Sequence, residues 1–265
     1  MCRLMGYLGQ TTLLHNILEK PEHSLVVQSY QPKEMTGGIL NADGFGIGWY
    51  DLDRYSIPFT YKNVLPIWSD INLPHLSRYI ESSCMLANVR SATPGQPVDL
   101  SNCQPFSHGQ ILGIHNGYIE NFRTSLFRPM RQALDDDYYQ AIGGTTDSEH
   151  IFALLWHNMQ RSPSANLADI LQTTIVQILG WSQEYGVKVS LNLVLSDGSQ
   201  LVACRCASHS PAPSLYWLQS DDDDKFPNSV VVASEPLFAD KAWVSFSENS
   251  VLSISPDLSV EIHKF

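Results

Sequence analysis

The feature that most constrains this 265-residue chain is an apolar strand that begins at its second residue. Residues 2–9 read Cys-Arg-Leu-Met-Gly-Tyr-Leu-Gly, a composition typical of a short buried strand. Chain ends usually fray unless the surrounding structure ties them down. We therefore expect residue 2 to be held by a rigid core, in a place where its side chain could do chemistry.

The rest of the chain interleaves predicted strands and helices and closes on a series of strands. Hydrophobic periodicity and capping signals predict helices at 13–20, 23–29, 73–82, 121–131, 147–159 and 167–185. Strands are predicted at 45–50, 84–89, 111–115, 189–195, 200–206, 214–218, 229–233, 251–255 and 258–263. This order indicates an α+β protein of mostly antiparallel sheets, which we expect to form a single domain over residues 1–265.

Turn-forming residues separate these elements. Residues 41–44 (Asn-Ala-Asp-Gly) predict a turn, and Asp197-Gly198 predicts a two-residue hairpin. Residues 91–106 hold three prolines and a glycine and predict a long loop. Glycines at 46 and 48, inside a predicted strand, indicate that another backbone or a ligand approaches closely. The four aspartates at 221–224 predict a solvated loop rather than a cation site.

Charge and cysteine content exclude several classes of protein. Sixteen basic against 27 acidic side chains give a net charge of -11, which repels phosphate backbones and anionic lipid, so we expect neither a nucleic-acid nor a membrane partner. The five cysteines form an odd set without a CxxC pair, which favours a reducing, cytoplasmic location. The first residues lack a basic segment followed by a long apolar run, so we expect no signal peptide, and no apolar run is long enough to span a bilayer. The nine histidines show no HExxH spacing, and no glycine-rich phosphate loop occurs, so we expect no metal and no cofactor.

Cys2 is the first candidate for chemistry. After removal of Met1, its thiol and a free α-amine would stand on neighbouring carbons. An α-amine has a pKa of about 7.7–8.0, so a sizeable neutral fraction near pH 7 can accept the thiol proton. One residue would then supply both nucleophile and base. A cysteine at position 2 without any function is the alternative that position by itself leaves open.

Three further residue sets could complete a site. Asn116 and Gly117 follow a predicted strand and could offer an amide side chain and a backbone N–H as an oxyanion hole, each worth about 3 kcal/mol. A plain turn is the alternative. Arg90, at the end of a predicted strand, suits bidentate capture of a carboxylate, or else a surface salt bridge. Asp147 stands at a predicted helix start, where it could bind an ammonium group or only cap the helix.

The ordered motifs resemble the class II (Ntn-type) glutamine amidotransferases over nearly the whole chain. The segments that carry the resemblance are Met-Cys-Arg at the start, 27–30, 41–46, 66–69, Asn-Val-Arg-Ser-Ala-Thr at 88–93, 101–106, Ile-His-Asn-Gly at 114–117, Thr-Thr-Asp-Ser-Glu at 145–149 and Val-Ala-Ser-Glu-Pro at 232–236. The same segments resemble two stand-alone branches of the family: the amidohydrolase of ergothioneine biosynthesis and the amidotransferase-like subunit of yeast glutathione degradation.

The resemblance implies a four-layer αββα sandwich and assigns roles to the candidates. Cys2 would be the nucleophile, with Asn116 and Gly117 as the oxyanion hole. Arg90 would bind the α-carboxylate of a γ-glutamyl group and Asp147 its α-ammonium group. Ser91 follows the arginine where the larger amidotransferases have Trp, and no ammonia-using domain follows in the sequence, so we expect hydrolysis rather than transfer.

The partner expected from this resemblance is a small γ-glutamyl substrate, cleaved to release glutamate. Its leaving group stays open between hercynylcysteine S-oxide, cysteinylglycine and ammonia. Trp68 and Phe106 are aromatic residues that could line the leaving-group side or pack in the core, and a trimethylated histidine would suit an aromatic face. A binding protein, or a subunit that is inert without a partner, is the rival hypothesis. The sequence leaves the oligomeric state open.

Overall fold

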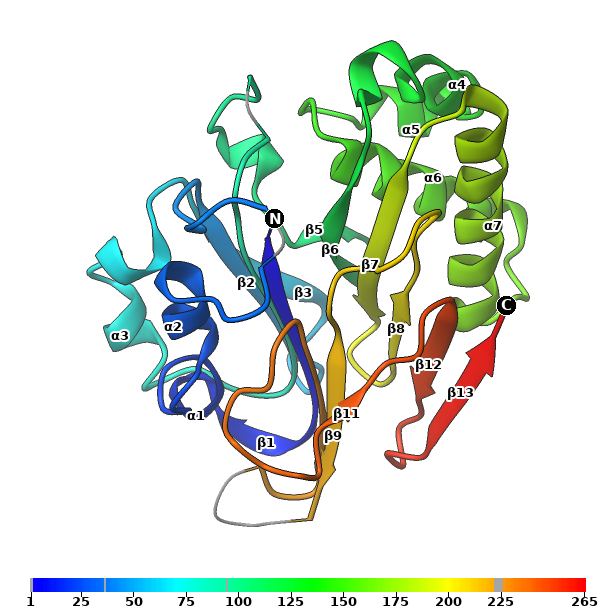
Figure 1. Cartoon of the computed structure of the whole chain (residues 1–265). Helices are drawn as coiled ribbons and strands as arrows, with labels where there is room; N and C mark the ends of the chain where they lie inside the picture. The colour runs from blue at the N-terminus through cyan, green and yellow to red at the C-terminus, as the bar shows by residue number, and fades with distance from the viewer. Residues whose placement is uncertain (1, 36, 94, 222–225) are drawn as a thin grey trace.

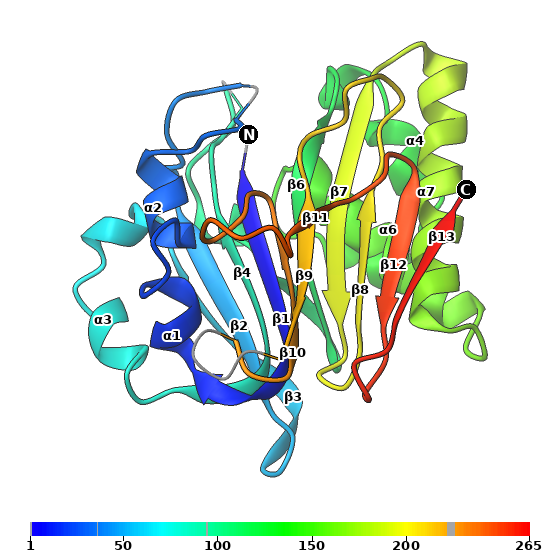
Figure 2. The same cartoon turned by 60° about the horizontal axis from the view of Figure 1, so that its bottom comes forward.

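The molecule is built from two antiparallel sheets packed face to face, with helices on both outer sides (Figures 1 and 2). The computed structural model describes residues 2–35, 37–93, 95–221 and 226–265. The seven-stranded sheet contains, in spatial order, β11 (Val244–Ser245), β9 (Tyr216–Ser220), β10 (Ser229–Ala233), β1 (Arg3–Leu13), β4 (Glu81–Val89), β2 (Phe45–Asp51) and β3 (Tyr55–Asn63). The six-stranded sheet contains β13 (Val260–Lys264), β12 (Ser250–Ile254), β8 (Leu201–Arg205), β7 (Val189–Ser196), β6 (Ile111–Ile119) and β5 (Phe106–His108).

Helices form the two outer layers. The seven-stranded sheet is covered by the short helices α1 (Leu14–Leu18) and α2 (Leu25–Tyr30), with η1 (Ile67–Ser69) and α3 (Leu73–Leu76) beside them (Figure 1). The six-stranded sheet is covered by α6 (Asp147–Arg161) and α7 (Leu167–Tyr185), while η3 (Phe122–Thr124), α4 (Phe127–Gln132) and α5 (Asp136–Gln140) lie at one end (Figure 1). A further 3-10 turn, η2 (Leu100–Asn102), lies in the segment between β4 and β5. The α+β sandwich expected from the sequence is thus confirmed.

The alternation of side chains along β1 explains why this strand is apolar on both faces. Leu4 and Leu8 point into the core between the sheets, whereas Met5 and Tyr7 point into the core under α1 and α2. β1 pairs with β4 on one side and with β10 on the other, so it is an interior strand of its sheet. The chain end that carries Cys2 is therefore anchored on both edges and both faces.

The helix predicted at 73–82 is wrong beyond its first turn. α3 ends at Leu76, and β4 begins at Glu81. Pro74 lies in the first turn, and the backbone of residues 81 and 82 pairs with Leu13 and Thr12 of β1 instead of continuing the helix. Tertiary pairing thus overrides the local helical pattern.

Several other boundaries also differ from the prediction. The helix at 121–131 is interrupted into η3 and α4, the loop at 91–106 contains η2 and ends in β5, and the hairpin after β7 has four residues rather than two. In that hairpin the Asp197 Oδ1 atom accepts hydrogen bonds from the N–H groups of Ser199 and Gln200, which stabilises the longer turn. The pattern did not predict β3, β11 or α5. Most of the aspartates at 221–224 lie outside the described residues.

The glycines of β2 do mark a close approach. A Cβ atom on Gly46 would lie 2.1 Å from the carbonyl oxygen of Gln104, so the segment that leads into β5 packs directly on this strand.

No helix among the described residues is long and apolar enough to cross a membrane. The same described residues contain no group of three or more His, Cys, Asp or Glu side chains that could hold a metal ion.

Candidate active site

The core between the two sheets becomes polar at the end where β1 begins. Leu112 and Ile114 of β6 fill this core, and Asn116 takes the next position on the same face. In the same way Leu86 of β4 is followed by Asn88, and Val194 of β7 is preceded by Asn192. Three buried asparagines therefore replace leucine-like residues at one end of an otherwise apolar layer, close to Cys2. Buried amides at such a place indicate a site rather than a packing role.

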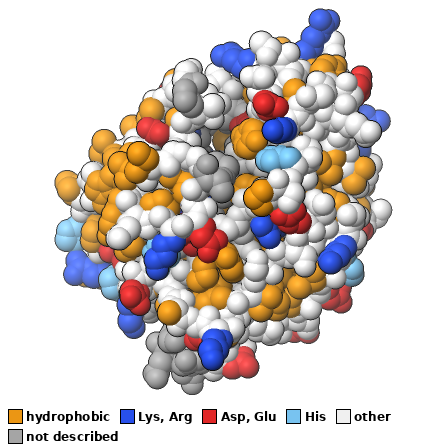
Figure 3. Space-filling view, in the orientation of Figure 1, with side chains coloured by type: hydrophobic (Ala, Val, Ile, Leu, Met, Phe, Trp, Pro, Cys, Tyr) orange, Lys and Arg blue, Asp and Glu red, His pale blue; other side chains and the backbone are white. Residues whose placement is uncertain are grey.

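A cavity of about 780 Å³ opens at this polar end, and the surface is hollowed near the start of β1 in the space-filling view (Figure 3). Cys2, Gly117 and Asp147, three of the predicted site residues, line it together. The loop after α2 supplies Gly37 and Gly38. The remaining lining residues are Ser91, Ala92, Thr93, Gly95, Gln96, Pro97, Tyr118, Ile119, Glu120, Asn121, Phe122, Arg123, Thr124 and Thr145.

Cys2 is partly exposed to this cavity, while the other four cysteines are buried. Its Sγ atom lies 3.9 Å from the carbonyl oxygen of Ser91, a long contact that leaves the sulfur accessible. Burial raises the pKa of the Cys84 and Cys206 thiols to about 12, which keeps both thiols protonated. Among the five cysteines, Cys2 alone has the access that a nucleophile needs.

Asn116 and Gly117 lie inside β6 rather than after its end, so the strand boundary predicted at residue 115 is wrong. Their backbones pair with Asn192 and Leu191 of β7, and this pairing outweighs the turn preference of Asn-Gly. Asn116 is fully buried just behind the cavity wall, its Nδ2 atom is 3.4 Å from the hydroxyl of Ser234, and its Oδ1 atom has no partner among the described residues.

Position 117 accepts only glycine because the backbone of β6 passes very close to β7 there. A Cβ atom there would lie 1.9 Å from the carbonyl oxygen of Ser190 and 2.4 Å from Nε2 of His115. The His115 ring is fixed on both sides: Nε2 donates to the Ser190 carbonyl oxygen at 3.1 Å, and Nδ1 accepts from the Ser148 hydroxyl at 2.8 Å. Burial lowers the pKa of His115, so the imidazole is neutral and serves as a support for this part of β6.

Asp147 is the first residue of α6, and its neighbour Thr146 is the actual N-cap, with Oγ1 accepting from Glu149 N–H at 3.2 Å. The Asp147 carboxylate accepts hydrogen bonds from the Ile119 and Ser148 N–H groups at 2.7 and 2.8 Å. It remains a cavity-lining anion, and no salt bridge pairs it with a cation within the described part of the chain. The Asp147 side chain therefore ties the start of α6 to β6 and also presents its carboxylate to the cavity.

Arg90 follows β4 directly and is 97% buried, so the surface salt bridge considered for it is excluded. Its guanidinium contacts the Pro97 carbonyl oxygen at 3.3 and 3.4 Å, the Gln96 side chain at 3.4 Å and the Asp43 carbonyl oxygen at 3.3 Å. No carboxylate lies within salt-bridge distance of it among the described residues. A buried cation held only by neutral oxygens attracts an anionic group. Arg90 lies behind the cavity wall formed by its neighbours Ser91, Gln96 and Pro97.

The two aromatic residues considered for the leaving-group side do not line the cavity. Phe106 is buried in β5 against Phe152, and Trp68 is partly exposed and packs edge-on against Tyr30. The aromatic residues of the cavity are instead Tyr118 and Phe122, which the sequence analysis did not single out. Both follow Gly117 closely, and this proximity was the one signal that could have identified them.

Thr145 is another lining residue that the sequence analysis gave no role. Its hydroxyl oxygen is buried without a hydrogen-bond partner among the described residues. A buried hydroxyl that lacks a partner costs about 1–3 kcal/mol, which a bound polar group can recover. Its backbone N–H donates to Oδ1 of Asn102 at 3.1 Å, so η2 fixes the position of this wall.

Comparison with known proteins defines the family. The sequence model of the class II glutamine amidotransferases matches residues 12–213. The γ-glutamyl-hercynylcysteine sulfoxide hydrolase of Mycobacterium tuberculosis is 31% identical, over 96% of this chain and 93% of that protein. The probable glutamine amidotransferase DUG3 of Saccharomyces cerevisiae is 29% identical, over 96% of this chain and 82% of that protein. The chain belongs to the class II glutamine amidotransferases.

Solved structures agree on the fold. A glutamine aminotransferase class-II domain protein from Silicibacter pomeroyi superimposes with a TM-score of 0.71 at 24% identity, over 100% of this chain and 99% of that one. The glutamine phosphoribosylpyrophosphate amidotransferase of B. subtilis gives a TM-score of 0.65 at 16% identity, over 99% of this chain and 49% of that one. These structures share the fold described above.

Proposed function

We propose that this protein hydrolyses γ-glutamyl amide bonds, with Cys2 as an amino-terminal nucleophile after Met1 has been removed. The observation that carries the proposal is the convergence of Cys2, Gly117 and Asp147 on one cavity, with Asn116 and Arg90 directly behind its wall. A nucleophile, an N–H donor and a free anion are the parts that such a reaction requires. The family to which the chain belongs supports the same chemistry.

The proposed reaction uses each group once. Arg90 attracts the α-carboxylate and Asp147 the α-ammonium of the γ-glutamyl group, which places its γ-carbonyl carbon beside the sulfur of Cys2. The thiol transfers its proton to the Cys2 α-amine as sulfur bonds to this carbon, and Asn116 and Gly117 stabilise the oxyanion. The protonated α-amine then gives the proton to the leaving nitrogen as the C–N bond breaks. Water cleaves the thioester, which yields glutamate and restores the thiol.

The substrate proposed first is γ-glutamyl-hercynylcysteine sulfoxide. Support comes from the hydrolases of that name, which align with almost the entire chain, and from the cavity itself. Beyond Gly117 the wall carries Tyr118, Glu120 and Phe122. Aromatic faces and a carboxylate suit a trimethylammonium group through cation–π and charge attraction. A cavity of about 780 Å³ has room for more than the γ-glutamyl part.

The second candidate substrate is glutathione or another γ-glutamyl peptide. Arg123 lies on the same wall, and a guanidinium suits the carboxylate at the end of a peptide leaving group. The resemblance to the amidotransferase-like subunit of yeast glutathione degradation supports this alternative. The same resemblance supports a role as a subunit that is inert without a partner. The two substrates differ in the group presented to Tyr118, Glu120 and Arg123.

The decisive experiment compares three substrates with the purified protein. Mass spectrometry first establishes that the chain begins at Cys2. Glutamate release is then measured with γ-glutamyl-hercynylcysteine sulfoxide, glutathione and glutamine, and kcat/KM should be highest for the first. Cys2→Ala should release none while keeping the wild-type melting temperature. Equal glutamate release by the wild type and Cys2→Ala would refute the proposed nucleophile.

A further inference from the structure

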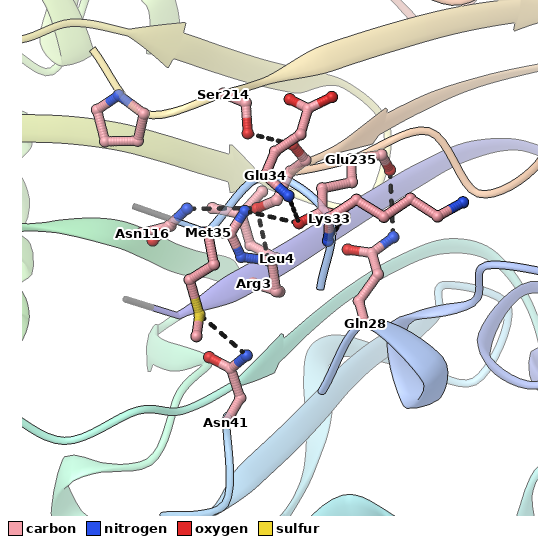
Figure 4. Close-up of polar contacts among 12 residues, drawn as sticks. Arg3, Leu4, Gln28, Lys33, Glu34, Met35, Asn41, Asn116, Ser214 and Glu235 are labelled. Carbon is pink, nitrogen blue, oxygen red and sulfur yellow. Dashed lines mark hydrogen bonds and ion pairs between the residues drawn. The ribbon is translucent and has the colours of Figure 1, made fainter. Parts of the chain in front are cut away.

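Two buried residues at the end of β10 connect the parts of the site that lie far apart in the sequence. Ser234 and Glu235 follow Ala233, the last residue of that strand, and their side chains are almost completely buried. Their contacts reach the start of β1, the side chain of Asn116 and the loop after α2. Figure 4 shows Glu235 among Arg3, Gln28 and Lys33. No step of the proposed reaction uses either Ser234 or Glu235.

The Ser234 hydroxyl joins the nucleophile strand to the oxyanion amide. Its oxygen accepts a hydrogen bond from Leu4 N–H at 3.0 Å and lies 3.4 Å from Nδ2 of Asn116. The Ser234 N–H donates in turn to the Leu4 carbonyl oxygen at 3.0 Å, so β1 is held two residues beyond Cys2 by a reciprocal pair. One hydroxyl thereby sets the spacing between Leu4 and Asn116.

In the structure Nδ2 of Asn116 faces the Ser234 hydroxyl, and the same hydroxyl also accommodates the opposite orientation of the amide. A serine hydroxyl has one hydrogen to donate, and Oδ1 of Asn116 is buried without a partner among the described residues. Rotation of the amide by half a turn lets Ser234 donate to Oδ1 while it still accepts from Leu4. The Asn116 NH₂ group then takes the position where the protein offers no acceptor, and it is available to an oxyanion.

The Glu235 carboxylate joins the nucleophile strand to the cavity wall. It accepts from Arg3 Nη1 at 3.2 Å and from His23 Nε2 at 2.7 Å. It also accepts from the backbone N–H groups of Lys33 and Glu34 at 2.8 and 3.0 Å. Four donors occupy the hydrogen-bonding positions of one carboxylate. Arg3 adjoins Cys2, and residues 33–34 lead into the wall residues Gly37 and Gly38.

We propose that Ser234 and Glu235 are positioning residues: Ser234 orients the Asn116 amide against the Cys2 strand, and Glu235 fixes that strand against the cavity wall. The inference rests on the proposed function, because it concerns the placement of the same nucleophile and oxyanion donor. Neither residue lines the cavity, so both act through the groups they hold. A displacement of about 1 Å at a reacting group can lower a rate by about 100-fold.

Ser234→Ala separates this role from a structural one. It removes the hydroxyl that accepts from Leu4 N–H but keeps the backbone hydrogen bond from Ser234 N–H to the Leu4 carbonyl oxygen. We therefore expect kcat to fall by about tenfold to 100-fold with KM changed less than threefold. Ser234→Thr keeps a hydroxyl and should recover most of kcat. The affinity for glutamate, measured by calorimetry in the Cys2→Ala background, should be unchanged by Ser234→Ala. Should Ser234→Ala not fold, Ser234→Cys keeps the shape, weakens the hydrogen bonds and should show the same loss of kcat.

The matched control is Ser229→Ala, which removes another buried serine hydroxyl from the opposite end of β10. That hydroxyl donates to the Phe226 carbonyl oxygen at 3.0 Å and is remote from β6. Ser229→Ala should keep kcat. If Ser234→Ala also keeps kcat within twofold, the positioning role is refuted and the proposed function stands. If the wild type with a free Cys2 releases no glutamate from any of the three substrates, the proposed function itself has failed.

Glu235→Gln tests the second half of the proposal. The amide keeps the size of the carboxylate but replaces one acceptor oxygen with an NH₂ group that faces N–H donors. We expect KM to rise together with a fall in kcat, because the wall at Gly37 and Gly38 and the strand of Cys2 both lose their common anchor. Glu235→Asp, which keeps the charge, should recover part of each. An unchanged KM and kcat in Glu235→Gln would overturn this half.

Discussion

The carboxylate of Asp147 accepts a hydrogen bond from the backbone N–H of Ile119 at 2.7 Å, which ties the first residue of α6 to the last residue of β6. Gly117 lies two residues earlier on β6, so this bond also fixes the strand that carries the predicted oxyanion donors. Because the same carboxylate lines the cavity, its charge is held at a defined distance from them. Strand placement and the proposed recognition of the substrate therefore depend on one side chain.

Asp147→Asn should weaken recognition of the substrate α-ammonium. Removing one partner of a largely desolvated charge pair costs about 2–5 kcal/mol, so kcat/KM for a γ-glutamyl amide should fall about 30-fold or more. Glutaric acid monoamide lacks the α-amine, and the wild type and Asp147→Asn should hydrolyse it at similar, low rates. The measurement is kcat/KM for glutamine and for this analogue. Equal losses with both amides would contradict binding of the ammonium by Asp147.

Arg90→Lys should weaken recognition of the α-carboxylate, since lysine cannot form the paired hydrogen bonds of a guanidinium. Hydrogen bonds to charged groups contribute about 1.5–3 kcal/mol, so a loss of about tenfold to 100-fold in kcat/KM is expected. The matched analogue is 4-aminobutanamide, which lacks the α-carboxylate and should be insensitive to the change. Each of the two variants thus serves as the other's control.

Gly117→Ala should destabilise the protein and abolish hydrolysis. The new methyl group would meet the Ser190 carbonyl oxygen at 1.9 Å, and backbone atoms cannot move aside as a flexible side chain would. Overpacking of this kind costs about 1–3 kcal/mol in the free energy of unfolding. Urea unfolding and glutamate release measure the two effects.

The control for that substitution is Gly180→Ala in α7. A Cβ atom on Gly180 meets nothing within 4 Å, and alanine is the better helix former by up to about 1 kcal/mol. Gly180→Ala should raise the free energy of unfolding and keep full activity. A Gly117→Ala protein as stable and as active as the wild type would show that the close approach of β6 to Ser190 is absent in solution.

Glu235 should make stability depend on pH in the acid range. Burial by itself raises the pKa of this carboxyl, but hydrogen bonds from His23, Lys33 and Glu34 and the charge of Arg3 outweigh burial and lower it. A lowered folded-state pKa gives stability that is fully present above the unfolded value of about 4.3 and is lost as pH falls through the folded value.

The measurement is the free energy of unfolding from pH 7 to pH 3 for the wild type and Glu235→Gln. Glutamine does not titrate, so the stability advantage of the wild type should be constant above about pH 5 and shrink below about pH 4. If the difference in the free energy of unfolding between the wild type and Glu235→Gln stays the same down to pH 3, the four hydrogen-bond donors do not lower the pKa of Glu235.

Arg123→Ala should change the preference for leaving groups without changing the chemistry. Arg123 lines the cavity, and we expect that only a substrate with an extended leaving group reaches it. We expect a higher KM for glutathione and an unchanged KM for glutamine, whose leaving group is ammonia. Steady-state kinetics with both substrates checks this. A parallel rise in both KM values would place Arg123 nearer to the glutamyl group.

The sequence predicted best those elements whose pattern is local and regular. Helix α7 has the predicted bounds, 167–185, because a capping asparagine and Gly186 mark its ends. The end of β6 was misjudged because Asn-Gly is a strong turn signal, and only the pairing with β7 shows that the strand continues. The edge strand β3 does alternate, with Tyr55, Ile57, Phe59 and Tyr61 at every second position, but Pro58 inside it argues against a strand.

The residues of the candidate site also fall into two groups: those that the sequence could identify and those that it could not. Cys2, Gly117 and Asp147 share a cavity that motif order and family resemblance pointed to. Ser234 and Glu235 belong to the segment 232–236 that carries part of the family resemblance, but nothing in its local pattern assigns a role to either side chain. Their burial and their bonds to Leu4, Arg3 and Asn116 arise only when β10 pairs with β1, more than 220 residues earlier.

The pairing of β1 with β10 also determines when, during synthesis, the amino-terminal strand becomes enclosed. During synthesis the amino-terminal strand emerges first, yet residues 229–233, its partner on one edge, emerge near the end of translation. Until then the beginning of the chain has one open edge and no Glu235 to hold Arg3. Removal of Met1, which the proposed nucleophile requires, therefore has the whole period of elongation in which to occur before the strand is enclosed.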